Sequence, residues 1–473
     1  MQKHFIHFII IFLFSTVVSV KADIPYELNE KLRAYPINSA NYSIHIQEVH
    51  SHQPIVTWNS HIQRKPASVI KLLTIYAGLL ELGYDYRWET KFFHSGYIRN
   101  GVLRGDLYVK ASGDPTLSTK DVDSIVSQIG DSGIRKILGN IIIDRSIFSV
   151  PSKNNSGFDR NKYSPYNAMP DAMMFNERRS TICVTPRGRG VRINRDTPDQ
   201  SYKIVNKLKI VNGSCRRGRS WPRVNIKTNS SGRSTIFLSG RLSKRCGKRT
   251  ICKVVSMPHR AFYYTLKNGL KKAGIGFQGT LKLKKVPKKA NYIFSHYSTT
   301  LENVISKIAK KSDNLMARQL MLTLGAKSFS PPSNNFKSRK AVKQILNRYH
   351  ILERGTTFLD NGSGLSRVSK LTAQSLNNLL IHGASRGDAR RWMDTLSIAG
   401  IDGTIRRRFK HSSVYGRAWM KTGTIRGVAN IAGYVEGSSG AIYSVVVLVN
   451  DRKSAQYGRK LANSVIEWVA DRL

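Results

Sequence analysis

The sequence predicts an α+β fold in which helices flank an antiparallel sheet. Residues 42–49 alternate apolar and polar side chains, and residues 55–58 follow across a turn, which is typical of a hairpin. After Tyr415 come a meander of strand-like segments and an amphipathic helix at 455–473. A long mixed region separates the two ends, so we expect the N-terminal hairpin to join the C-terminal sheet. The C-terminal strands are expected at 418–422, 428–435 and 441–449.

A helix is predicted directly after Pro66. Residues 69–82 hold almost no charge except Lys71 and Glu81, and Gly83 ends the run. Proline at the start, glycine past the end and apolar residues all round indicate a buried helix. Apolar residues at three and four spacing predict further helices at 121–129, 262–273, 301–310, 314–325 and 337–349.

The middle of the chain divides by composition. One part is a small α/β module with strands at 105–110 and 136–144. Another is a strand-rich lobe, in which residues 187–253 hold 19 Lys or Arg and only two acids, Asp196 and Asp199. The expected boundaries are 23–90 and 289–473 for the main domain, 91–182 and 255–288 for the module, and 183–254 for the lobe.

All four cysteines, Cys183, Cys215, Cys246 and Cys252, fall in this basic lobe. An even number of cysteines in an exported chain predicts two disulfides, with three pairings that the sequence leaves open. A zinc site is disfavoured because no Cys-x-x-Cys pair is present. No metal and no cofactor are expected.

Residues 1–22 predict export. A basic start, an apolar run over 8–20 and the Val20-Lys21-Ala22 end resemble a cleavable secretory signal. An uncleaved anchor is the alternative, although about 13 residues are short for a membrane span. We therefore expect a periplasmic or other cell-envelope protein.

The charge balance is strongly basic, with 77 Lys and Arg against 29 Asp and Glu, a net charge of +48. Such a surface attracts polyanions. In an exported protein, the anionic wall, acidic peptides or anionic lipids are better partners than nucleic acid, and no specific nucleic-acid partner is expected. A solvated basic surface without a dedicated partner is the alternative.

Ser68 and Lys71 are the first candidate catalytic pair. Their spacing places a hydroxyl and an amine on one face of the predicted buried helix. A lysine in apolar surroundings loses its proton easily and can then deprotonate the serine, while the helix N-terminus stabilises an oxyanion. A capping serine and a lysine that reaches solvent would be the structural alternative.

Two further motifs follow. Ser312-Asp313-Asn314 lies between two predicted helices, where a plain helix cap is the alternative. Lys421-Thr422-Gly423-Thr424 lies in a predicted edge strand, which offers backbone groups to an extended peptide, while Lys421 offers charge to a carboxylate. A surface strand with a turn glycine would also explain it.

Together, Ser-x-x-Lys, Ser-x-Asn and Lys-Thr-Gly in this order resemble the signature of penicillin-binding proteins and serine β-lactamases. The long gap from Ser68 to Ser312, with the stretches at 112–117 and 360–367, is similar to the low-molecular-mass class C carboxypeptidases, peptidase family S13. The resemblance implies a serine β-lactamase/DD-peptidase-like domain with two smaller domains inserted between the first and second motifs.

The resemblance also implies a role for each motif residue. Ser68 would be the acylated nucleophile, Lys71 its base, Ser312 the relay to the leaving amine and Asn314 a ligand of the substrate amide. Lys421 and Thr422 would hold the terminal carboxylate next to Gly423, and the N–H groups of Ser68 and Thr424 would form the oxyanion hole.

Three positions bear on the stem-peptide preference that the resemblance implies. The family uses an acidic residue of the inserted module, an arginine and a polar residue to recognise the free end of the stem peptide. Arg367 fits the second, whereas the third is Arg426 and the first is either Asp159 or Asn161. Two arginines would favour an acidic group over an ammonium group.

The sequence thus predicts a D-alanyl-D-alanine carboxypeptidase, with endopeptidase action as an addition, that acts on peptidoglycan peptides and is inhibited by β-lactams. A β-lactamase and a basic wall-binding protein without turnover are the alternatives. Gly383-Ala384-Ser385-Arg386-Gly387 fits the Gly-x-Ser-x-Gly elbow, but helical residues precede it, so we expect Ser385 to be a loop serine.

Overall fold

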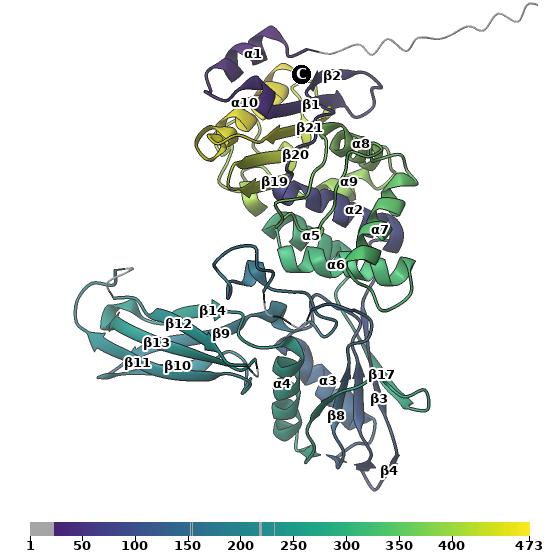
Figure 1. Ribbon diagram of the computed structural model, residues 1–473, viewed down its shortest axis with the longest axis vertical. Coiled ribbons are helices and arrows are strands. Elements are labelled where there is room, and N and C mark those ends of the chain that lie inside the picture. Colours follow the sequence, from purple (N-terminus) through teal and green to yellow (C-terminus); the bar gives the residue numbers. More distant parts are fainter. Residues whose placement is uncertain (1–22, 152, 154, 217–219, 231) are drawn as a thin grey trace, which may run out of the picture.

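The computed structural model describes residues 23–473 except 152, 154, 217–219 and 231, so the expected signal at 1–22 lies outside the described residues. The chain forms three parts (Figure 1). The N-terminal and C-terminal segments build the upper domain, an α/β module lies below it, and a strand-rich lobe projects to one side of the module. Within the described part of the chain, no helix has the length and apolar character needed to cross a membrane.

The upper domain is built on one antiparallel sheet of six strands, in the order β18-β19-β20-β21-β1-β2. The expected pairing of the two chain ends is confirmed, because β1 pairs with β21 along its whole length. The strands are β1 (Tyr42–Glu48), β2 (Pro54–Trp58), β18 (Ser397–Ile398), β19 (Ala418–Ile425), β20 (Val428–Glu436) and β21 (Ile442–Val449).

Helices cover both faces of this sheet. One apolar core lies between the sheet and most of the helices, and a second lies between the sheet and the two terminal helices α1 (Tyr26–Arg33) and α10 (Arg459–Arg472). A π-helical turn, Ser454–Gly458, precedes α10. The helices on the first face are α2 (Lys71–Leu82), α5 (Leu301–Lys311), α6 (Asn314–Ser328), α7 (Asn335–Asn347), α8 (Ala373–Ala384) and α9 (Ala389–Asp394).

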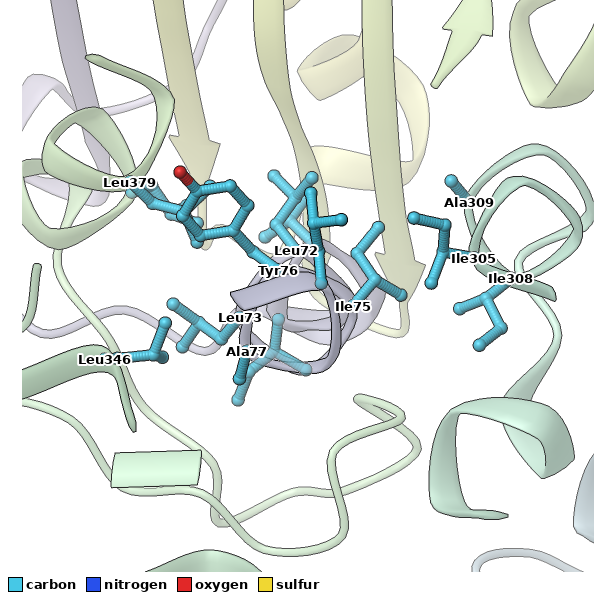
Figure 2. Close-up of a cluster of buried hydrophobic side chains, with 14 of the residues drawn as sticks. Leu72, Leu73, Ile75, Tyr76, Ala77, Ile305, Ile308, Ala309, Leu346 and Leu379 are labelled. Atoms are coloured by element: carbon cyan, nitrogen blue, oxygen red, sulfur yellow. The ribbon is translucent and has the colours of Figure 1, made fainter. Parts of the chain in front are cut away.

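Helix α2 is the centre of the first core. Every residue from Lys71 to Leu79 is buried, and its apolar side chains pack against α5, α7 and α8 (Figure 2). Gly83 ends the helix, as its position in the sequence predicts, and has a positive φ of +77° that glycine adopts readily. The start differs from the prediction: residues Ala67–Ile70 form a 3₁₀ turn, and Lys71 is the first α-helical residue.

The α/β module has two small sheets, of orders β16-β8-β6-β3-β17 and β15-β7-β5-β4, with helices α3 (Thr119–Asp131) and α4 (Pro258–Lys272) packed in the same core. Strand β17 pairs with β3, so the boundary expected at 288/289 falls inside the module. The strands are β3 (Glu89–His94), β4 (Tyr97–Arg99), β5 (Val102–Arg104), β6 (Leu107–Lys110), β7 (Lys136–Ile137), β8 (Ile141–Asp144), β15 (Gly276–Phe277), β16 (Leu281–Leu283) and β17 (Asn291–Tyr297).

The lobe consists of two three-stranded sheets, β10-β9-β14 and β11-β13-β12, around a small apolar core. In the first sheet β9 lies between two antiparallel neighbours, whereas in the second β13 pairs in parallel with β11. The strands are β9 (Ser180–Arg187), β10 (Gly190–Arg195), β11 (Lys203–Val211), β12 (Arg223–Thr228), β13 (Ser234–Ser243) and β14 (Arg249–Lys253).

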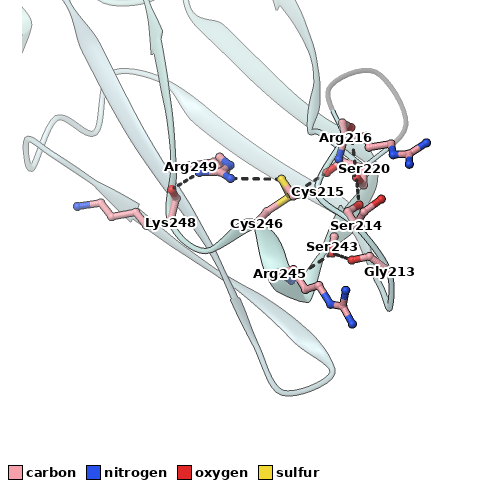
Figure 3. The surroundings of a disulfide bond; sticks show 10 residues. All are labelled: Gly213, Ser214, Cys215, Arg216, Ser220, Ser243, Arg245, Cys246, Lys248 and Arg249. Carbon is pink, nitrogen blue, oxygen red and sulfur yellow. Dashed lines mark hydrogen bonds between the residues drawn. A yellow bond between two sulfur atoms is a disulfide. The ribbon is translucent and has the colours of Figure 1, made fainter.

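The prediction of two disulfides is corrected, because the structure has one. Cys215 and Cys246 are bonded (Figure 3), whereas Cys183 and Cys252 are free thiols. Cys183 lies opposite Thr250 and Cys252 opposite Thr181, so the two free cysteines are diagonal neighbours on adjacent strands. Diagonal Cα atoms are about 7–8 Å apart, beyond the 4.4–6.8 Å span of a disulfide.

Candidate active site

Ser68 and Lys71 are in contact, as their spacing predicts. Lys71 Nζ lies 2.8 Å from Ser68 Oγ and 2.7 Å from Asn314 Oδ1, and it also donates to the carbonyl oxygen of Ser363. Asn314 Oδ1 and the Ser363 carbonyl can only accept hydrogen bonds, so a neutral amine donates its two N–H groups to them. Its lone pair then remains for the hydroxyl of Ser68.

The surroundings of Lys71 favour this neutral amine. The side chain is fully buried, and burial is the main cause that holds its pKa well below the usual value. The nearby charges of Lys421 and Arg318 lower the pKa further, whereas Asp313 opposes them. These surroundings therefore favour the uncharged amine, which is the form that can accept a proton.

The second motif occupies the break between α5 and α6. Ser312 ends α5 with a left-handed backbone, φ +55°, and Asp313 caps α6 by accepting from the N–H groups of Leu315 and Met316 at 2.9 Å. Asp313 is thus the cap, while its neighbour Asn314 contacts Lys71 and its neighbour Ser312 contacts Lys421.

The third motif completes the group. Lys421 Nζ donates to Ser312 Oγ at 3.1 Å and to the carbonyl of Thr422 at 2.7 Å. Lys421 is fully buried, which lowers its pKa to about 7. Its strand, β19, is covered by β18 only at Trp419 and Met420, so the outer edge of the motif is not covered by that strand.

Gly423 allows the third motif to approach Ser68. A Cβ atom at this position would lie 2.7 Å from the carbonyl oxygen of Pro66 and 2.8 Å from the backbone nitrogens of Ser68 and Val69. Any side chain would therefore displace the turn that carries the nucleophile. The glycine sets the separation between the backbone of Ser68 and that of β19.

One cavity of about 500 Å³ is lined by residues of all three motifs, namely Ser68, Ser312, Thr422 and Thr424. Lys71, Asn314 and Lys421 reach the same group through the hydrogen bonds above. The residues that carry the predicted chemistry are therefore brought together from three segments of the chain.

Arg367 and Arg426 lie at the surface. The guanidinium of Arg367 stacks 4.8 Å from the ring centroid of Phe158, and Arg426 is exposed in the turn between β19 and β20. Asp159 is engaged within its own loop, where its carboxylate accepts from Tyr166 Oη at 2.8 Å and from Asn167 Nδ2 at 2.7 Å. That loop reaches the site, since Asn314 Nδ2 donates to the Tyr166 carbonyl at 3.3 Å.

Two groups that support Lys71 lie outside the three predicted motifs. The carbonyl of Ser363 orients Lys71, and Arg318 lies behind it: Arg318 Nη1 donates to the Ala168 carbonyl at 3.1 Å and Nε approaches Ser363 Oγ at 3.4 Å. A signal for Arg318 was present, because it is a charge in an otherwise buried helix one turn beyond Asn314. Within the described residues, no group of three or more His, Cys, Asp or Glu side chains is arranged to hold a metal ion.

Comparison with known proteins agrees with this arrangement. The family model "D-Ala-D-Ala carboxypeptidase 3 (S13)" matches residues 26–472. The chain is 25% identical over 445 residues to the D-alanyl-D-alanine carboxypeptidase DacB of Haemophilus influenzae, covering 93% of this chain and 91% of that protein. It is 26% identical over 400 residues to the D-alanyl-D-alanine carboxypeptidase of Actinomadura sp. R39, covering 81% and 73%.

The fold agrees as well. The crystal structure of penicillin-binding protein 4 (dacB) from Haemophilus influenzae superposes with a TM-score of 0.77 at 25% identity, covering 93% of this chain and 99% of that one. This chain belongs to the D-Ala-D-Ala carboxypeptidase 3 (S13) family.

Proposed function

We propose that the protein is a serine-type D-alanyl-D-alanine carboxypeptidase that acts on peptidoglycan stem peptides through an acyl-enzyme on Ser68. The observation that carries this proposal is the contact set of Lys71, in which two obligate acceptors take its N–H groups and leave the lone pair for Ser68. The family membership and its carboxypeptidase relatives supply the substrate class.

The proposed reaction begins when Lys71 takes the proton of the Ser68 hydroxyl and Oγ attacks the carbonyl of the penultimate D-alanine. The backbone N–H groups of Ser68 and Thr424 stabilise the oxyanion. Ser312 passes a proton to the leaving amine, and D-alanine departs. Water then attacks the acyl-enzyme, which restores Ser68 and releases the shortened peptide.

The other motif residues hold the substrate. Lys421 and Thr422 bind the terminal carboxylate, Asn314 binds a substrate amide, and the free edge of β19 pairs with the peptide backbone. The same contacts suit a β-lactam, whose carboxylate and strained amide resemble the D-alanyl-D-alanine end. A cross-linked peptide presents the same bond, so endopeptidase action is part of the proposal, as is a place in the periplasm or cell envelope.

The test is intact-mass measurement after incubation with a β-lactam, with D-alanine release from a pentapeptide measured in parallel. We expect a stable adduct and D-alanine release, both lost in Ser68→Ala. Rapid hydrolysis of the drug would instead indicate a β-lactamase. An absent adduct with no D-alanine released would indicate a binding protein.

Recognition of the stem peptide is proposed to involve Arg367 and Arg426. Both are exposed cations, which favour a carboxylate over an ammonium group. Wild type and Arg426→Gln should therefore differ in their preference between free and amidated stem peptides. Equal preferences in the two enzymes would exclude this role for Arg426.

An anionic partner in the envelope is proposed for the lobe. The strand register places six exposed cations on one face of the β11-β13-β12 sheet, and the described residues from 200 to 253 include no acid. A face with one sign of charge attracts a polyanionic surface. The six are Lys203, Lys207, Lys209, Arg223, Lys227 and Arg241.

Salt-dependent sedimentation with isolated cell walls, and separately with vesicles that contain anionic lipid, tests this surface. Replacement of Lys203, Lys207 and Lys209 by glutamine should weaken binding. Replacement of Lys284, Lys285 and Lys288, exposed lysines of the module, removes the same charge and should weaken it less. Equal losses would mean that only net charge matters.

A further inference from the structure

The catalytic cavity extends beyond the groups that the proposed reaction uses. Its lining continues from Thr422 and Thr424 to the start of α10 and to the segment after Ile405. Three arginines line this extension, Arg407, Arg408 and Arg459, and none of the described residues that line the cavity is acidic. The extension is therefore a cationic compartment.

Arg408 shows that this charge is poorly compensated. Its Nη2 donates to Asn463 Oδ1, while its buried Nε has no hydrogen-bond partner among the described residues. The pKa of Arg408 is lowered to about 10, mainly by burial and to a smaller extent by the charge of Arg459, with Glu467 as the opposing charge. Two guanidiniums that repel one another beside a cavity are suited to an anion, which would relieve the repulsion.

The compartment connects directly to the site of the leaving group. Thr404, in the 3₁₀ turn Gly403–Ile405 that leads into the arginines, contacts Thr422 with 2.8 Å between the two Oγ1 atoms. In the proposed reaction Thr422 and Lys421 hold the carboxylate of the residue that departs. The arginines thus lie beyond that carboxylate, and a cavity of about 500 Å³ is much larger than one carboxylate requires.

We infer that Arg407, Arg408 and Arg459 form an anion subsite on the leaving-group side, which takes a second carboxylate carried by the departing part of the substrate. The inference rests on the proposed function. It names the preferred substrate class: peptides whose leaving part carries a carboxylate besides its terminal one, as the second strand of a peptide cross-link does. The bond cleaved is unchanged: the acyl carbon gains hydroxide from water, and the leaving amine gains a proton.

The test uses three synthetic peptides that share one acyl part ending in D-alanine and differ in the leaving residue, which is D-alanine, D-glutamine or D-glutamate. D-glutamate carries the second carboxylate, and D-glutamine is its neutral match in size. For the wild type we expect kcat/KM for the D-glutamate peptide to exceed that for the D-glutamine peptide by about tenfold, the size of one charge-assisted hydrogen bond. High salt should reduce this ratio.

The double variant Arg407→Gln/Arg459→Gln should bring the ratio of D-glutamate to D-glutamine close to one. Both side chains are exposed, so the fold should persist, and a melting temperature checks it. Arg406→Gln is the matched control, since Arg406 is an exposed neighbour that does not line the cavity, and it should keep the wild-type ratio.

A wild-type ratio near one, or a ratio that survives in the double variant, would overturn the subsite. In those cases D-alanine would still be released from the first peptide, and the proposed function would stand. Loss of release from all three peptides, together with no β-lactam adduct on Ser68, would overturn the proposed function and the subsite together.

Discussion

Replacing Lys71 by methionine isolates the step on which the proposed reaction depends. Methionine keeps the length and most of the volume of the side chain but removes the amine. The hydroxyl of Ser68 then has no base in contact, because the amine at 2.8 Å is the group that faces it. A positioned general base contributes about 10²–10⁴-fold, so the acylation barrier should rise by about 3–5 kcal/mol.

The same change has a separate cost in stability. Asn314 Oδ1 and the Ser363 carbonyl each lose the donor that they now share, at about 1–3 kcal/mol for each buried acceptor left unpaired. Because burial keeps the amine of Lys71 in its neutral form, its replacement removes no charge from beside Lys421 and Arg318. A moderate fall in melting temperature is expected, with the fold kept.

The assay is the rate of acylation by a fluorescent penicillin, measured on folded protein at several drug concentrations. Lys327→Met, the same substitution at an exposed position of α6, is the control and should acylate at the wild-type rate. If Lys71→Met acylated within tenfold of the wild type, the assignment of Lys71 as the base would be refuted.

Three further outcomes are expected. Gly423→Ala should slow acylation at least 10²-fold, because its Cβ would displace the turn that provides an oxyanion donor. Gly387→Ala is the control: open space surrounds this position, so acylation should keep the wild-type rate in stopped-flow measurements. Burial lowers the pKa of His45 and of His259 from 6.5 to about 4. The free energy of unfolding should therefore be highest above pH 6.5 and should fall by about 3 kcal/mol for each histidine as the pH falls toward 4, because the unfolded chain binds the protons first. Urea unfolding over this pH range should show a smaller loss for His45→Gln than for the wild type. Cys215→Ser opens a bridge with a sequence separation of 31 and should destabilise the lobe by about 3–4 kcal/mol, seen as faster proteolysis of the lobe than of the rest.

Local sequence patterns predicted where strands and helices form, but they did not predict what packs against each of them. The alternation in residues 42–49 correctly predicted strand β1, although such an alternation is usually typical of a strand with one face in solvent. In the structure Ser43, His45 and Gln47 are buried, because β1 is an inner strand and α8, more than 300 residues away in sequence, packs on that face. The polar side chains find partners there, such as Asn377 for Gln47 at 2.7 Å. Only tertiary structure reveals the second layer.

The candidate site was predictable where side chains carry the chemistry. Ser68, Lys71, Ser312 and Lys421 are specific residue types at specific spacings, and they meet as expected. The carbonyl of Ser363 was not predictable in this way, since every residue has a carbonyl group and its position depends on the backbone. Gly364, the next residue, is the one sign of this contact in the sequence. A Cβ atom at this position would lie 1.9 Å from the Ala67 carbonyl oxygen, so only glycine permits this loop to reach the catalytic turn.

The two buried lysines also explain how substrate binding and base activation can support each other. Burial and the charge of Lys421 are the two largest causes that lower the pKa of Lys71. Lys421 alone has a pKa of about 7, so near neutral pH it carries its charge only part of the time. A substrate carboxylate next to it would favour the charged form. The bound substrate would thus keep Lys421 protonated. The positive charge of Lys421 would in turn disfavour protonation of Lys71, so that the amine of Lys71 stays neutral and can deprotonate Ser68.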